Sequence, residues 1–198
     1  MPVLSRGAEF IFGQSTREIV TFLGLQEKSG PELPPAELYA RLDKFMTAAM
    51  GLLPLMPDGK LHIHVPGRPR SYRALAFHLF RVVAAFLDAE QGTTLAQAAF
   101  REEPAADADM ASVAAYGAVV QERFRDWWAQ GDTGATRMLP TYYGAQSLHE
   151  LLERTTWHSG QHVRQWMMLL EREGVSHDCP LGEADFKGLP MPQNVWDG

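Results

Sequence analysis

The longest regular pattern of apolar and polar positions runs from Ser147 to Arg172. Ser147 and Glu150 stand three residues apart, which is the capping-box arrangement of a helix start, and Gly174 follows the pattern's end. One face recurs at spacings of three and four residues, as on a helix side that faces a core. That face consists of Leu148, Leu151, Thr155, His158, His162, Gln165 and Leu169. We expect one long helix whose inward face carries two histidines and a glutamine.

Three further segments repeat apolar residues at helical spacing, and Pro54 marks the end of the first. They are expected to form helices over about 35–53, 71–89 and 109–130. The second of them places His78 at an inward position. Together with the helix at 147–172, they predict a mainly helical fold built as a four-helix bundle.

The first 25 residues follow a different pattern. Two short apolar runs flank Arg6-Gly7, which predicts a hairpin, and Ser15 stands where a short helix would begin. A polar, proline-rich linker follows over 26–35. We therefore expect a small hairpin-helix appendage at 1–30 and the helical domain with its C-terminal tail at 31–198.

The remaining connections are less regular. Alternation from Leu61 to Val65 predicts a short extended segment. His62 and His64 would share a face there, but no third ligand stands nearby, so a surface strand is the preferred interpretation. A short helix is expected over 93–100, and a loop over 131–146.

Composition and charge narrow the class of protein. The chain has 198 residues, 45% of them apolar, and a net charge of −6, which suits one folded domain and argues against general nucleic-acid binding. A single cysteine, Cys179, excludes an internal disulfide framework and suits a reducing compartment. No apolar run is long enough for a membrane span, and no signal peptide is apparent, so we expect a cytoplasmic protein.

Three histidines are candidate metal ligands. His158 and His162 are four residues apart, so they are neighbours on one helix face and can bind the same ion. The alternative is that each is a core histidine hydrogen-bonded to a neighbour. His78, inward on a separate helix, favours the metal site, because three imidazoles from two helices form a ligand set that leaves coordination positions open.

Other polar residues are candidates for substrate binding or catalysis. Arg70 and Arg73 stand near the start of a predicted helix, where guanidinium groups can hold a carboxylate or phosphate. The alternative is a solvated loop with surface ion pairs. The loop before the last helix is of a length that is often functional, and either of its tyrosines, Tyr142 or Tyr143, could approach the metal ion.

The histidine pattern resembles the DinB/YfiT family of metal-binding four-helix bundles. The likeness lies in Trp157–Gln165, which contains His158, His162 and Gln165, and in Ala76–Leu79 around His78, and it covers about 35–175. Many family members have a second histidine beside the later ligand, whereas this chain has His162 alone there.

The resemblance implies a zinc or nickel ion held by the three histidines, a homodimer, and transfer or isomerisation that uses a low-molecular-weight thiol. The positions of the residues themselves make Gln165 a candidate to orient a ligand, and Arg70 with Arg73 candidates to hold an anionic substrate. Residues 2–25 resemble the C-terminal half of a glutaredoxin-like domain, which points to glutathione as cosubstrate. A metal-dependent hydrolase and a non-catalytic metal-binding stress protein are the alternatives.

Overall fold

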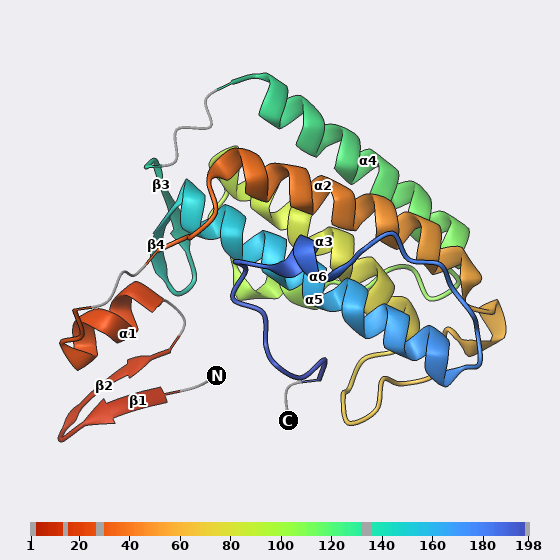
Figure 1. The fold of residues 1–198 in the computed structure, drawn as a ribbon, viewed down its shortest axis with the longest axis horizontal. Coiled ribbons are helices and arrows are strands. Elements are labelled where there is room, and N and C mark those ends of the chain that lie inside the picture. Colours follow the sequence, from red (N-terminus) through yellow and green to blue (C-terminus); the bar gives the residue numbers. More distant parts are fainter. Residues whose placement is uncertain (1–2, 14–15, 27–29, 132–135, 197–198) are drawn as a thin grey trace.

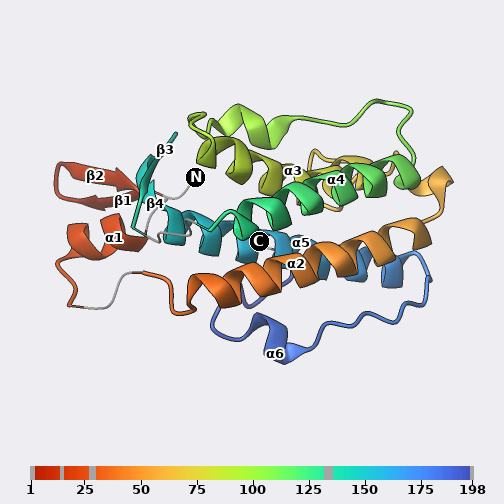
Figure 2. The same ribbon diagram turned by 90° about the horizontal axis from the view of Figure 1, so that it is seen from above.

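The structure, a computed structural model, describes residues 3–13, 16–26, 30–131 and 136–196, which form a mainly helical molecule with two small β-hairpins. The long helices lie side by side around a shared apolar core (Figures 1 and 2). They are α2 (Pro35–Leu52), α3 (Tyr72–Glu90), α4 (Met110–Ala129) and α5 (Leu148–Arg172). Each begins and ends close to the bounds that its apolar spacing predicts.

Local signals in the sequence account for the starts of these helices. Pro35 occupies the first turn of α2, where its missing N–H costs nothing. The side chains of Ser71 and Asp109 cap α3 and α4 by accepting hydrogen bonds from the backbone. Ser147 and Glu150 form the expected capping box of α5. The inward positions predicted for α5 are buried or partly buried, which confirms the helical pattern.

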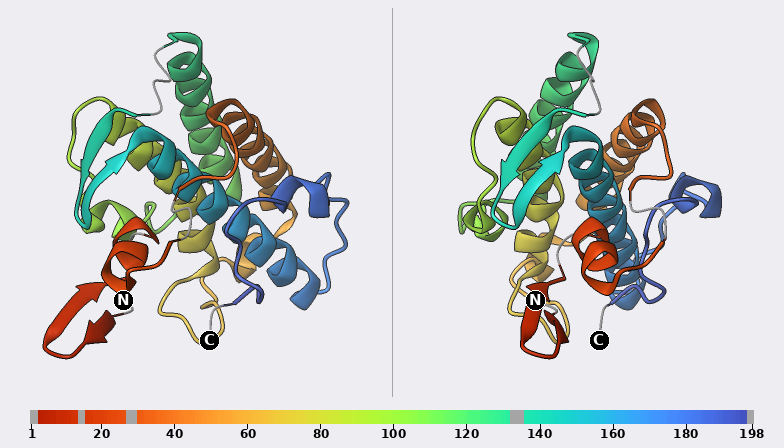
Figure 3. Two further views of the ribbon diagram at one scale, coloured as in Figure 1. Left: turned by 60° about the vertical axis from the view of Figure 1, so that its left-hand side comes forward. Right: turned by 90° about the vertical axis from the view of Figure 1, so that its left-hand side faces the viewer.

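Helix α5 packs between α2 and α3, and α4 covers the opposite side of both (Figure 3). Glycines permit the closest approaches. A Cβ added at Gly160 of α5 would lie 2.7 Å from the ring of Phe45 on α2, and one at Gly117 of α4 would lie 2.5 Å from Phe80 on α3. The absence of side chains at these two positions therefore sets how near the helices lie.

The appendage has the expected elements. Strands β1 (Val3–Arg6) and β2 (Glu9–Phe12) pair antiparallel, with Gly7 in the turn at a positive φ of 63°. Helix α1 (Thr16–Leu23) follows and lies beside the second hairpin at one end of the long helices (Figure 1). Ser15, the expected helix start, lies outside the described residues.

Two expectations for the connections are wrong. The segment 131–146 contains strand β3 (Met138–Thr141), which pairs antiparallel with β4 (Gly144–Ser147). The backbone of Leu95 lies alongside β3, donating a hydrogen bond to Pro140 O and accepting one from Tyr142 N. A segment distant in sequence therefore helps to stabilise this short hairpin. Residues 61–65 are not a strand, because a turn follows the 3-10 helix η2 (Asp58–Lys60) and a single bridge joins His64 to Ser71.

Short helices complete the described chain. They are η1 (Leu53–Leu55), η3 (Gln97–Arg101) and α6 (Glu183–Phe186), of which η3 matches the helix expected over 93–100. The tail after α6 contacts α5, where Gln161 donates to Asn194 O and Arg164 donates to Pro192 O. Among the described residues, we find no helix whose length and apolar character would suffice to cross a membrane.

The tight contact at Gly160 predicts an unusual response to alanine. Alanine normally stabilises a helix interior relative to glycine by about 1 kcal/mol. Gly160→Ala should instead lower the free energy of unfolding by roughly 1–3 kcal/mol, because the buried Phe45 ring has to move. Gly51→Ala, in α2 with no atom within 4 Å of the added Cβ, is the matched control and should be neutral or stabilising. Urea unfolding followed by circular dichroism measures both, and equal responses would contradict the packing argument.

Candidate metal centre

The predicted ligands from α3 and α5 lie together in the helical core. His158 and His162 stand one turn apart on α5, and His78 faces them from the middle of α3. One potential ligand nitrogen from each residue lies within 4.8 Å of the others. The ring centroids are 4.7 Å apart for the α5 pair, and the His78 ring is 4.9 Å from His162 and 5.5 Å from His158. If these histidines were ordinary core residues rather than metal ligands, three imidazole rings would have to be packed side by side in the core.

The hydrogen bond between His162 and Gln165 decides which ring nitrogen can bind a ligand. The amide nitrogen of Gln165 donates to Val195 O at 3.1 Å, so its Oε1 is the atom that lies 2.7 Å from His162 Nδ1. An amide oxygen only accepts, which assigns the ring proton to Nδ1 and leaves a lone pair on Nε2. Gln165 thus orients His162 by a hydrogen bond to the nitrogen that faces away from the histidine group.

Two buried nitrogens of the group lack hydrogen bonds. Within the described part of the chain, neither His162 Nε2 nor His78 Nδ1 has a hydrogen-bond partner, although both are shielded from solvent. Leaving such atoms unpaired costs roughly 1–3 kcal/mol each. A divalent ion that accepts these lone pairs would remove that cost, so the residues present fit a metal ion.

Burial keeps the three imidazoles neutral. It is the main cause that lowers the pKa of His78 and His158 far below the usual range, and the neighbouring imidazoles lower both values further. Burial also lowers the pKa of His162 to about 4, although the hydrogen bond to Gln165 opposes the shift. Since metals bind neutral imidazole, all three side chains are in the competent form at neutral pH.

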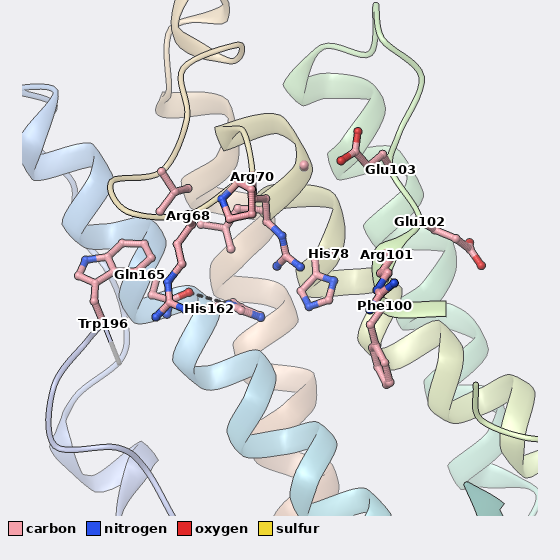
Figure 4. Close-up of a pocket in the computed structure, with 14 residues that line it drawn as sticks. Arg68, Arg70, His78, Phe100, Arg101, Glu102, Glu103, His162, Gln165 and Trp196 are labelled. Carbon is pink, nitrogen blue, oxygen red and sulfur yellow. Dashed lines mark hydrogen bonds between the residues drawn. The ribbon is translucent and has the colours of Figure 1, made fainter. Parts of the chain in front are cut away.

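A cavity of about 520 Å³ opens beside this group (Figure 4). His78 and His162 line one wall, and the loop before α3, the helix η3 and the C-terminal tail form the others. The remaining charged and aromatic lining residues are Arg68, Arg70, Phe100, Arg101, Glu102, Glu103 and Trp196. His158 lies on the far side, where it lines a small void with Arg154 and Phe100. The cavity therefore gives small molecules access to the histidine group from one direction.

The other predicted site residues separate into two groups. Gln165 and Arg70 line the cavity. Arg73 does not line it, because its guanidinium donates to Ala106 O. Tyr142 lies in the turn between β3 and β4, is 37% exposed, and reaches the site through the ring of Phe100, 6.3 Å away.

Several wall residues of the cavity carry no signal in the sequence that predicts their position. Phe100 and Arg101 belong to a short helix whose orientation no periodicity specifies, and Trp196 follows a proline-rich tail without a regular pattern. Trp196 is held there by its indole N–H, which lies 2.9 Å from Met168 Sδ of α5.

No model of a protein family matches the chain, and no curated protein matches it.

Replacing single ligands should abolish metal binding without unfolding the helices. His78→Ala, His158→Ala and His162→Ala should each lose the ion, because two imidazoles hold a divalent cation far more weakly than three. Gln165→Leu should keep the ion but weaken affinity by roughly 10- to 100-fold. The matched control is His149→Ala, which removes an α5 histidine bonded to Leu33 O instead. Elemental analysis with circular dichroism tests this, and unchanged metal content in the ligand variants would contradict the site.

The metal-free protein should lose stability as the pH falls from 7 towards 4. The pKa of His162 is about 4 when folded and 6.5 without the fold, so the unfolded state binds more protons between these values. Stability then rises with pH, by at most about 1.4 kcal/mol per pH unit from this histidine. Urea unfolding in chelator at pH 7, 6 and 5 measures the slope. His162→Gln should have a shallower slope, and parallel slopes would disprove the assignment.

Proposed function

We propose that this protein is a divalent-metal-dependent enzyme whose ion is held by His78, His158 and His162. The observation that carries the proposal is the position of the histidine group at the wall of the cavity. Within the described residues, the group of convergent ligand atoms consists of these three side chains. A structural site is normally closed by four protein ligands, whereas three ligands beside a cavity leave room for a substrate.

The proposed reaction is the transfer or isomerisation of an electrophilic substrate by a low-molecular-weight thiol. A bound divalent ion would lower the pKa of a thiol and so supply a nucleophile at neutral pH. In a transfer, the thiol proton leaves to solvent, the sulfur bonds to an electrophilic carbon, and the leaving group departs with its electron pair. Gln165 keeps His162 in the ligand tautomer, while Phe100 and Trp196 narrow the cavity around the reacting groups.

The resemblance to the DinB/YfiT family supports the same proposal. The histidines of its motif are the residues that converge here, and the packing of α2, α3, α4 and α5 suits the four-helix bundle of that family. Zinc or nickel suits a set of imidazole ligands. The hairpin and helix of the first 25 residues favour glutathione as the thiol by analogy with glutaredoxin-like domains, and the family favours a homodimer.

Calorimetry with glutathione tests the choice of nucleophile. Zinc-loaded protein should release or absorb heat on titration with glutathione, and protein stripped with chelator should not. His162→Ala should behave like the stripped protein. The matched ligand is S-methylglutathione, which should bind at least tenfold more weakly, because its sulfur cannot become a thiolate. Absence of heat with the zinc-loaded protein would reject the thiol reaction and favour hydrolysis by water at the same site.

A further inference from the structure

Arg70 lines the cavity without a hydrogen-bond or ion-pair partner among the described residues. Its guanidinium points into the cavity and lies near His78 (Figure 4). No hydrogen bond or ion pair of this guanidinium is present among the residues that the structure describes. By contrast, Arg81 on the same side of α3 is held by Glu102 at 2.7 and 3.0 Å and by Asp88 at 3.3 Å. The pairing of Glu102 with Arg81 also directs that carboxylate away from Arg70.

The positive charge of Arg70 acts on all three histidines of the group. Its positive charge contributes to the lowered pKa of His78, of His158 and of His162. The environment disfavours the charge, because burial lowers the pKa of Arg70 more than attraction from Glu103 raises it, and repulsion from Arg68 lowers it further. A guanidinium is nevertheless protonated at any physiological pH. The fold therefore keeps a partly buried, unpaired cation beside three imidazoles.

A metal ion at the histidines would make this arrangement less favourable still. Two positive centres would then face one cavity, and the part of the chain described here supplies no carboxylate bonded to either. An anionic ligand between them would relieve the repulsion. The fork of a guanidinium matches a carboxylate in two parallel hydrogen bonds. The volume of the cavity, about 520 Å³, is within the range of small-molecule sites.

We propose that Arg70 is the anchor of a carboxylate subsite, so that the ligand that reacts at the histidine group carries a carboxylate. This inference rests on the proposed metal-dependent function and specifies its substrate class. The carboxylate belongs either to the thiol or to the second substrate. Arg73, its neighbour in sequence, takes no part because its guanidinium is bonded to Ala106 O.

A pair of thiols that differ at one end tests the subsite. Cobalt-loaded protein is titrated with 3-mercaptopropionate and with 3-mercapto-1-propanol, and the cobalt absorption spectrum reports binding of the sulfur. If the thiol carries the carboxylate, the wild type should bind 3-mercaptopropionate roughly 10- to 100-fold more tightly, as expected for a charge-assisted pair. Arg70→Gln should reduce this preference to less than threefold, and Arg73→Gln, the matched control, should keep it.

A second titration locates a carboxylate that belongs to the other substrate. Propionate is added to cobalt-loaded protein saturated with 3-mercapto-1-propanol and followed by calorimetry. Binding that Arg70→Gln weakens at least tenfold supports the subsite and assigns it to the second substrate. Arg70→Lys should retain part of either preference, since the charge remains without the fork, and it serves as the test if Arg70→Gln does not fold.

The outcomes separate this inference from the proposed function. A preference for 3-mercaptopropionate that persists in Arg70→Gln would show chelation by the metal alone and would overturn the subsite. Equal affinity of the two thiols for the wild type, without Arg70-dependent propionate binding, would overturn it as well. In both cases cobalt remains bound, so the metal centre stands. Failure of the wild type to bind cobalt would overturn the metal centre and the subsite together.

Discussion

The close packing of α5 against α2 and α3 is the constraint on which the candidate metal centre depends. Gly160 stands between His158 and His162, and a Cβ there would lie 2.7 Å from Phe45. The backbone of α5 is thus as near to α2 as a side chain of that size allows. Since the three candidate ligand atoms span 4.8 Å, a shift of α5 by the width of one methyl group would alter the whole set of distances. Helix packing and ligand geometry are therefore a single property of this fold.

The same packing leaves two energetically unfavourable features at the site, which are unpaired histidine nitrogens and an unpaired arginine. It removes three imidazoles from water, which keeps them neutral but leaves His162 Nε2 and His78 Nδ1 without hydrogen bonds. It holds Arg70 beside them without a partner. A cation alone would satisfy the nitrogens and increase the repulsion on Arg70, and an anion alone would satisfy Arg70 but not the nitrogens. A metal ion together with a carboxylate ligand satisfies both, which is why the two proposals support each other physically.

Much of the fold could be predicted from the sequence, because the long helices carry their own signals. Ser147 with Glu150, and Pro35, mark helix starts through local hydrogen bonding and fixed backbone angles. Inward spacing placed His78 and the α5 pair towards a common core, so their convergence could be expected. The β3–β4 hairpin could not be predicted in this way. Its four-residue strands depend on hydrogen bonds to the backbone of Leu95, which is distant in sequence, and no local pattern at Leu95 predicts that pairing.

The candidate site shows the same limit at the level of single side chains. Arg70 and Arg73 are equivalent in the sequence, yet Arg70 precedes the N-cap Ser71 and faces the cavity, whereas Arg73 lies within the first turn of α3 and bonds to Ala106 O. Gln165 could be placed next to His162 by helical spacing alone. Its second hydrogen bond, to Val195, comes from 30 residues along the chain and fixes which way its amide points. The tautomer of His162 thus depends on a contact with the C-terminal tail, which helical spacing does not predict. Which nitrogen of His162 can bind a ligand therefore follows only from the tertiary structure.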